Sequence, residues 1–161
     1  MTASAGGSLL DRRRVELVDD ALPAIPHHHE AQLLAPAEGI ALVERVRVSA
    51  ERHAQRALAA LEADVPDIAG IALRVCPLLP ATIEERIKDY RARNVADWVM
   101  YRKALASAAE ARGWTIYWYD AKSVGEYVLD LRKTHGSPWN ADHKLAMAGA
   151  LAVLQKVRAA R

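Results

Sequence analysis

Two short apolar segments separated by a long helical segment constrain the fold of this chain more than any other feature. IAGIALRVC at 68–76 is almost wholly apolar and ends before Pro77, and WTIYWYD at 114–120 is rich in aromatic and β-branched residues. Segments of this length and composition are typical of strands. Because a helix between two strands carries the chain back across their sheet, we expect these strands to be parallel, with a right-handed crossover.

Helical periodicity accounts for much of the remaining sequence. Apolar residues recur every three or four positions from Pro36 to about residue 64, and again over 83–112. This spacing predicts two long amphipathic helices. TIEE at 82–85 matches a capping box, in which a Thr and a Glu side chain satisfy the first backbone N–H groups, so the second helix is expected to begin there.

The other segments complete an α/β pattern. RRVELVDDA at 13–21 alternates between apolar and polar residues and predicts a short edge strand. SVGE predicts the start of a helix over 123–133, and Asn140 is a suitable cap for a last helix. We expect residues 1–11 to be a flexible lead. Residues 12–161 are expected to form a single compact α/β domain with a small, partly parallel sheet and long amphipathic helices.

Composition excludes some classes of protein. Cys76 is the one cysteine in 161 residues, so no intramolecular disulfide can form. No apolar run reaches the roughly 18 residues that a membrane span needs. We therefore expect a cytoplasmic protein with no membrane partner. The net charge of +2 permits a nucleic-acid partner without favouring one.

Residues with useful chemistry occur at the carboxyl ends of both predicted strands, where open parallel sheets bind their ligands. Arg74 lies near the end of the first strand, and Asp120 follows the second. Arg74 is a candidate ligand-binding residue. Asp120 is a candidate catalytic residue that could act as a base, hold a metal ion or orient another group. The alternative is that Asp120 only begins a turn.

A second candidate site lies on the helix predicted at 83–112. Asn94, Asp97 and Tyr101 are three and four residues apart, so they share one side of the helix and are candidate ligand-binding residues. A polar amide within an apolar stripe costs free energy unless it is hydrogen-bonded. Either the helix breaks and Asn94 caps its second half, or the stripe faces a polar site. Three nearby arginines either favour phosphate or form a solvated face: Arg91, Arg93 and Arg102.

The run HHHE at 27–30 contains metal-ligating residue types. Adjacent side chains of an extended chain point to opposite faces, so His27 and His29 could share one face and His28 and Glu30 the other. A zinc site normally needs three or four protein ligands, and neither pair supplies them. We therefore expect His28 and Glu30 to bind a metal ion only together with a residue from elsewhere in the chain.

The start of the last predicted helix offers such a residue. Asp142 and His143 fall in its first turn. An acidic residue there stabilises the helix by interacting with the helix dipole, which is one interpretation. The other is that both side chains project into a metal-ion site, with Asp142 completing the ligand set of His28 and Glu30.

Four segments of the C-terminal half follow one another in a distinctive order. They are IAGIALR, ADWVMYRKALASAAEARG, WTIYWYD and ADHKLAMAGALA, within about residues 68–155. This layout resembles the RNase H-like superfamily, in particular RuvC-type resolvases. In those nucleases a carboxylate or histidine at the start of the last helix binds a catalytic divalent ion. The resemblance therefore implies that Asp120, Asp142 and His143 are catalytic and that Mg²⁺ or Mn²⁺ is the cofactor.

The chain also departs from the pattern of that superfamily. An acidic residue is expected at the end of the strand before the long helix, where this sequence has Arg74, Val75 and Cys76. No clear counterpart of the aspartate on the first strand of the superfamily is present. The resemblance thus implies a degenerate site, in which His28, Glu30 and Asp120 would have to substitute for the missing ligands.

Three functions remain as hypotheses. The long helices and the lack of a complete catalytic motif favour a non-enzymatic interaction or regulatory module, with a protein partner or a second copy of the chain. The resemblance implies a nucleic-acid-binding protein or a divalent-metal nuclease instead. A small-ligand binder would use the strand ends with Trp98, Tyr101 and Trp118, unless these aromatic residues pack in the core. The sequence favours the interaction module and leaves enzymatic activity undecided.

Overall fold

The computed structural model of the chain confirms an α/β protein, in which helices accompany a small parallel sheet. It describes most of the chain, namely residues 1–4, 6–122 and 140–159. Contacts divide the chain into two compact units. Unit 1 comprises Met1–Arg14, Glu62–Val75 and Gly113–Arg161, and unit 2 comprises Val15–Leu61 and Cys76–Arg112. The single domain expected over 12–161 stays a prediction, because two compact units can belong to one domain.

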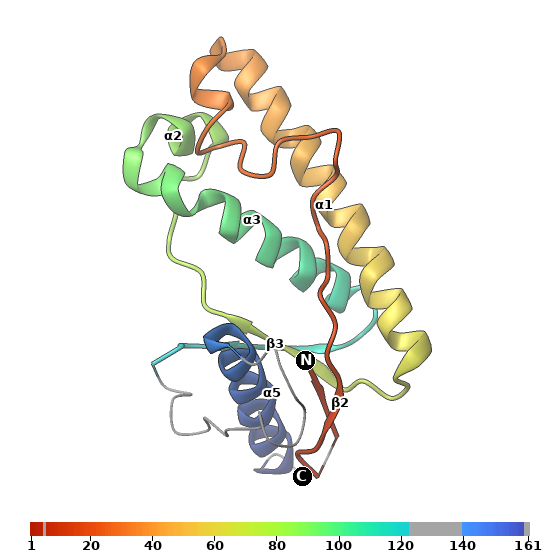
Figure 1. Ribbon diagram of the computed structural model, residues 1–161. Coiled ribbons are helices and arrows are strands. Elements are labelled where there is room, and N and C mark those ends of the chain that lie inside the picture. Colours follow the sequence, from red (N-terminus) through yellow and green to blue (C-terminus); the bar gives the residue numbers. More distant parts are fainter. Residues whose placement is uncertain (5, 123–139, 160–161) are drawn as a thin grey trace. The chain divides into compact units, whose positions relative to one another are not determined.

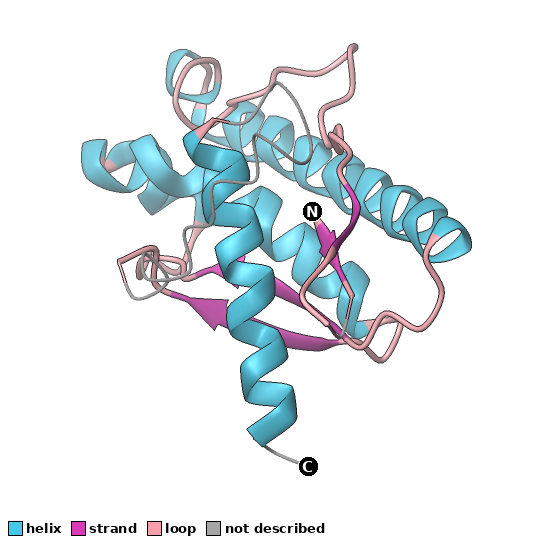
Figure 2. Cartoon of the chain, turned by 60° about the horizontal axis from the view of Figure 1, so that its bottom comes forward, coloured by secondary structure: helices cyan, strands magenta, loops and turns pink. Residues whose placement is uncertain are grey.

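Unit 1 contains a two-stranded parallel sheet. β3 (Gly70–Arg74) pairs in parallel with β4 (Thr115–Tyr119) along all 5 residues of each strand. α5 (Ala141–Ala159) contacts β3, and Figure 2 shows this helix crossing the two strands. Met147 and Ala148 of α5 are buried. The parallel pairing predicted from the two apolar segments is therefore confirmed.

Two glycines allow close approach within unit 1. A Cβ atom on Gly70 would lie 2.5 Å from the carbonyl oxygen of Thr115 in the neighbouring strand. A Cβ atom on Gly149 would lie 2.7 Å from the ring of Tyr119. Both distances are shorter than van der Waals contact, so any larger residue would push the elements apart.

The N-terminal residues, expected to be a flexible lead, form a small hairpin instead. β1 (Thr2–Ala3) pairs antiparallel with β2 (Leu9–Asp11), and β1 also contacts α5. Gly7 makes the turn: its φ is 88°, and its N–H donates to the carbonyl oxygen of Ser4 at 2.9 Å. Glycine reaches this left-handed conformation without steric cost. Strands this short have too few residues to show the period-2 alternation that identifies a strand.

The long helix predicted from Pro36 is confirmed. α1 (Pro36–Asp64) begins at that proline, and most of it belongs to unit 2. Figure 1 shows it as the long helix coloured orange to yellow. Its buried face includes the predicted apolar positions Val43, Val46, Ala50 and Ala54. Among the described helices, none is both long enough and apolar enough to cross a membrane.

The predicted capping box is also confirmed, at the start of a shorter helix. Thr82 precedes α2 (Ile83–Lys88), and its Oγ1 accepts a hydrogen bond from the backbone N–H of Glu85 at 3.2 Å. The Glu85 carboxylate accepts in return from the backbone N–H of Thr82 at 2.9 Å. η1 (Ala31–Leu33), a single turn of 3₁₀-helix, contacts α2.

The helix predicted over 83–112 breaks earlier than expected. Asp89 has an extended backbone and separates α2 from α3 (Tyr90–Glu110). Its Oδ1 accepts from the backbone N–H groups of Arg91 at 2.8 Å and Ala92 at 3.0 Å. Asp89 is therefore the N-cap, and the expectation that Asn94 fills this role is wrong. Both residue types are good caps, so composition alone could not distinguish the two positions.

The strand predicted at 13–21 is wrong. From Val15 onwards this segment belongs to unit 2, whose described residues contain no strand with which it could pair. It runs as an extended loop and ends in a turn, where the N–H of Leu22 donates to the carbonyl oxygen of Asp19 at 2.9 Å. The helix predicted at 123–133 lies outside the described residues.

Candidate functional site

The carboxylate of Asp97 on α3 is almost completely enclosed within unit 2. Asp97 is 2% exposed, and His27, in the loop before η1, is 1% exposed. Oδ1 of Asp97 lies 2.7 Å from Nδ1 of His27 and accepts from the backbone N–H of the same residue at 3.2 Å. Oδ2 accepts from the backbone N–H of His28 at 3.2 Å. One buried carboxylate thus bonds three N–H groups, as a buried charge requires.

His27 is held in a defined orientation by this carboxylate. In a neutral ring whose Nδ1 donates to Asp97, the other ring nitrogen, Nε2, is an acceptor. Nε2 is buried and has no hydrogen-bond partner among the described residues. Aspartate orients histidine in the same way in catalytic triads, but there Nε2 faces the nucleophile and the substrate. Here burial keeps Nε2 from a substrate, so the pair attaches the loop to α3.

Tyr101, one turn after Asp97, attaches the same loop. Its hydroxyl donates to the carbonyl oxygen of Ala24 at 2.6 Å. Burial, with smaller contributions from the charges of Asp97 and Glu16, raises the pKa of Tyr101 to about 12. We call His27, Asp97 and Tyr101 the Asp97 cluster. Asp97 and Tyr101 do lie together, as helical spacing predicts. Their hydrogen-bond partners, however, are other groups of this protein.

The raised pKa of Tyr101 gives a pH-dependent prediction. Tyr101→Phe is expected to lower the free energy of unfolding by about 1 kcal/mol near neutral pH, because the bond to Ala24 is lost. The pKa in the folded protein, about 12, exceeds the value of about 10 in an unfolded chain, so the folded state holds the proton more tightly. This stabilisation is complete below pH ~10 and is lost as pH rises towards ~12.

Urea unfolding of both proteins at increasing alkaline pH tests this expectation. The difference in free energy between wild type and Tyr101→Phe should shrink above pH ~10. Tyr90→Phe is the matched control, because Tyr90 lies on the same helix and is 66% exposed. A difference for Tyr101→Phe that stays constant with pH would contradict the prediction.

The other residues predicted near this site have weaker contacts. The rings of His28 and His29 meet edge to face, with centroids 4.5 Å apart. Glu30 is exposed and makes no side-chain cap for η1. Asn94 is half-buried within α3. Because Asp142 belongs to unit 1, its convergence with His28 and Glu30 stays a prediction.

At the strand ends of unit 1 the predicted residues have local roles. Oδ1 of Asp120 accepts from the backbone N–H of Lys122 at 2.9 Å, as expected if Asp120 begins a turn. Asn140 Oδ1 accepts from the backbone N–H of His143 at 3.1 Å, so Asn140 caps α5 as predicted. Arg74 and Asp142 are exposed, and His143 is half-buried. Throughout the described ranges, no three His, Cys, Asp or Glu side chains gather as ligands for a metal ion.

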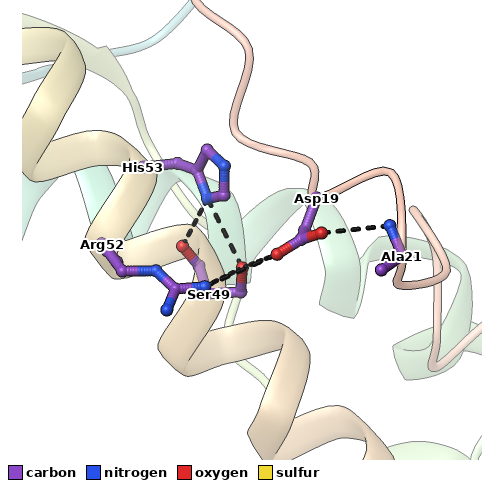
Figure 3. Close-up of polar contacts among 5 residues, drawn as sticks. All are labelled: Asp19, Ala21, Ser49, Arg52 and His53. Atoms are coloured by element: carbon purple, nitrogen blue, oxygen red, sulfur yellow. Dashed lines mark hydrogen bonds and ion pairs between the residues drawn. The ribbon is translucent and has the colours of Figure 1, made fainter.

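Unit 2 contains a second polar cluster, which the sequence patterns did not predict and which Figure 3 shows. We call it the Ser49 cluster: Asp19, Ser49, Arg52 and His53. The hydroxyl of Ser49 donates to Oδ2 of Asp19 at 3.1 Å, and Nη2 of Arg52 lies 3.5 Å from the same oxygen. Nδ1 of His53 lies 2.8 Å from the carbonyl oxygen of Ser49. Hydrogen bonds from the backbone N–H of Ala21 and from Ser49 lower the pKa of Asp19.

The Ser49 cluster contains the residue types of a serine nucleophile but not their arrangement. In a catalytic triad, histidine lies between serine and aspartate and accepts the serine proton. Here Nδ1 of His53 is directed to a carbonyl oxygen and must donate, and Ser49 donates to Asp19 instead. The cluster therefore attaches the loop to α1. The one sign of this cluster in the sequence is that a serine, Ser49, lies between Val46 and Ala50, which are both buried in α1.

The outward side of α3 forms a third feature, which we call the α3 outer stripe: Arg91, Val95, Trp98 and Arg102. Their spacings of four, three and four residues place them along one side of the helix. Trp98 is 61% exposed. The guanidinium groups of Arg91 and Arg102 form no hydrogen bond or ion pair within the described chain. The acidic residues nearest in sequence are engaged, since Asp89 caps the helix and Asp97 is buried.

Comparison with known proteins identifies no relative of this chain. No protein-family model, curated protein or solved structure matches it. Three features of unit 2 therefore bear on function: the Asp97 cluster, the Ser49 cluster and the α3 outer stripe. Of these, the α3 outer stripe has two large exposed side chains, Arg91 and Trp98, while Val95 and Arg102 are half-buried.

Proposed function

We propose that this chain is a non-enzymatic interaction module that binds single-stranded nucleic acid through the α3 outer stripe. The observation that supports this most is Trp98, an indole that is 61% exposed between two arginines. Every nucleic-acid base has a flat face that can stack on an exposed aromatic side chain. Positive charge beside it favours an anionic partner with flat faces.

The spacing of the α3 outer stripe suits this partner. At about 1.5 Å per residue, Arg91 lies about 10 Å along the helix from Trp98, and Arg102 about 6 Å beyond it. A base can stack on the indole while the flanking phosphates pair with the two guanidinium groups. Stacking on an aromatic side chain contributes about 1–3 kcal/mol per base and does not depend on sequence.

Binding without catalysis is supported by the other two clusters. The carboxylates of Asp97 and Asp19 and the hydroxyl of Ser49 are all used in hydrogen bonds within unit 2. The RNase H-like resemblance stays a hypothesis. It would instead require Mg²⁺ or Mn²⁺ at Asp120, Asp142 and His143.

Replacing Trp98 tests the proposal. Trp98→Ala is expected to weaken the binding of a labelled single-stranded oligonucleotide at low salt by about tenfold, measured by fluorescence anisotropy. Trp98→Phe should recover part of this loss, because phenylalanine still stacks. Trp118→Ala is the matched control, since Trp118 is 41% exposed but lies in β4 of unit 1.

The two arginines provide a second measurement. Replacing both Arg91 and Arg102 is expected to reduce the slope of log affinity against log salt concentration, by the amount that about two phosphate contacts contribute. The proposal fails if no single-stranded oligonucleotide binds at low salt. It also fails if Trp98→Ala and Trp118→Ala bind the oligonucleotide with equal affinity. Cleavage with Mn²⁺ that Asp142→Asn abolishes would favour the nuclease instead.

A further inference from the structure

Beside the Ser49 cluster, unit 2 contains an open pocket of about 360 Å³. Residues of α1 and of the preceding loop line it: Leu22, Glu44, Arg45, Val48, Ser49 and Arg52. This volume is at the lower end of the range for small-molecule sites. Figure 3 shows two of the lining residues, Ser49 and Arg52, next to Asp19.

The acidic side chains at this pocket already have partners. Oε2 of Glu44 accepts from Nε of Arg47 at 2.7 Å. The Asp19 carboxylate accepts from a backbone N–H at 3.0 Å and from the Ser49 hydroxyl at 3.1 Å. Arg45, by contrast, is exposed and makes no hydrogen bond or ion pair with any described residue. Arg45 therefore has a charge that an incoming anion can neutralise.

Arg52 is a second available cation. Its Nη2 lies 3.5 Å from Asp19, at the outer limit of a hydrogen bond, and 3.3 Å from the hydroxyl oxygen of Ser49. The side chain of Arg52 is 55% exposed. Because Asp19 keeps two other donors, Arg52 can turn towards a ligand without leaving that carboxylate unpaired. Arg45 and Arg52 lie seven residues apart on α1, so they share one side of the helix.

We propose that this pocket binds a small amphipathic carboxylate, such as a short-chain fatty acid. The carboxylate pairs with Arg45 and Arg52, and the aliphatic chain covers Leu22 and Val48. Arginine binds carboxylates through paired N–H groups, and removing apolar surface from water stabilises the bound aliphatic chain. The pocket is formed by α1 and its preceding loop, so this inference does not depend on nucleic-acid binding by α3.

Titration of the ¹⁵N-labelled protein with hexanoate tests the inference. We expect shifts of the backbone amide signals of Leu22, Val48 and Ser49, with a Kd of about 1 mM, as suits a small ligand held by two charges and a short chain. The double variant Arg45→Ala, Arg52→Ala is expected to bind at least about tenfold more weakly. Arg56→Ala is the matched control, because Arg56 is exposed on α1 outside the pocket.

Two outcomes would overturn the proposal. One is the absence of shifts at these amides with hexanoate. The other is equal binding of hexylamine, which has the same chain and the opposite charge and would show that the arginines do not select the ligand. Because the substituted arginines are on the surface, circular dichroism of each variant should match that of the wild type.

Discussion

Replacing Asp97 with alanine is expected to destabilise the protein by about 3–5 kcal/mol. This carboxylate accepts from the backbone N–H groups of His27 and His28 and lies 2.7 Å from Nδ1 of His27. Alanine would leave these donors without an acceptor in a buried environment, and each unsatisfied group costs about 1–3 kcal/mol. Urea unfolding should show a lower midpoint with an unchanged slope.

Two comparisons make this prediction specific. Asp20→Ala is the matched control, because Asp20 is an exposed aspartate of the loop that precedes the helices, and its loss should cost less than about 0.5 kcal/mol. His27→Ala combined with Asp97→Ala should destabilise less than the sum of the single changes, because the two residues share a contact. A loss for Asp97→Ala as small as for Asp20→Ala would show that the cluster does not hold the loop.

Gly70→Ala is expected to have the second largest effect, a destabilisation of about 2–3 kcal/mol. The added methyl group would lie 2.5 Å from the carbonyl oxygen of Thr115, a backbone atom that cannot rotate away. Relief requires β3 and β4 to move apart, which weakens the parallel hydrogen bonds between them. Thermal unfolding followed by circular dichroism measures the loss.

Gly113→Ala separates this steric effect from a purely conformational one. Gly113 has a φ of 73°, but a Cβ atom there would have nothing within 4 Å. Its substitution should therefore cost only the strain of a left-handed alanine, about 1–2 kcal/mol. Equal losses at both positions would mean that close packing at Gly70 does not stabilise unit 1.

The predictions that succeeded depend on local chemistry. The Thr82 and Glu85 capping box, the start of α1 at Pro36 and the cap of α5 at Asn140 each need only residues within a few positions of one another. Such signals are present in the sequence regardless of what the segment later contacts. The strand predicted at 13–21 failed because a strand also needs a neighbour, which alternation cannot supply.

The candidate sites show the same limit. Helical spacing correctly placed Asp97 and Tyr101 on one side of a helix, but not their partners, which lie 70 or more residues away in the chain. The HHHE run predicted His28 and Glu30 as metal ligands, which stays a prediction, but it gave no sign that His27 lies against the carboxylate of Asp97. Nothing in the sequence relates Ser49 to Asp19, since a serine on a helix shows no preference for one distant loop.

The sequence by itself determined most of the elements: where α1, α2 and α5 begin, and which segments form parallel strands. Periodicity and caps act over a few residues, so they are readable without coordinates. Only the tertiary structure decided that His27 meets Asp97, that Ser49 meets Asp19, and that Trp98 faces solvent. These outcomes depend on which buried polar groups find partners once the elements pack, and that choice is made between residues far apart in the chain.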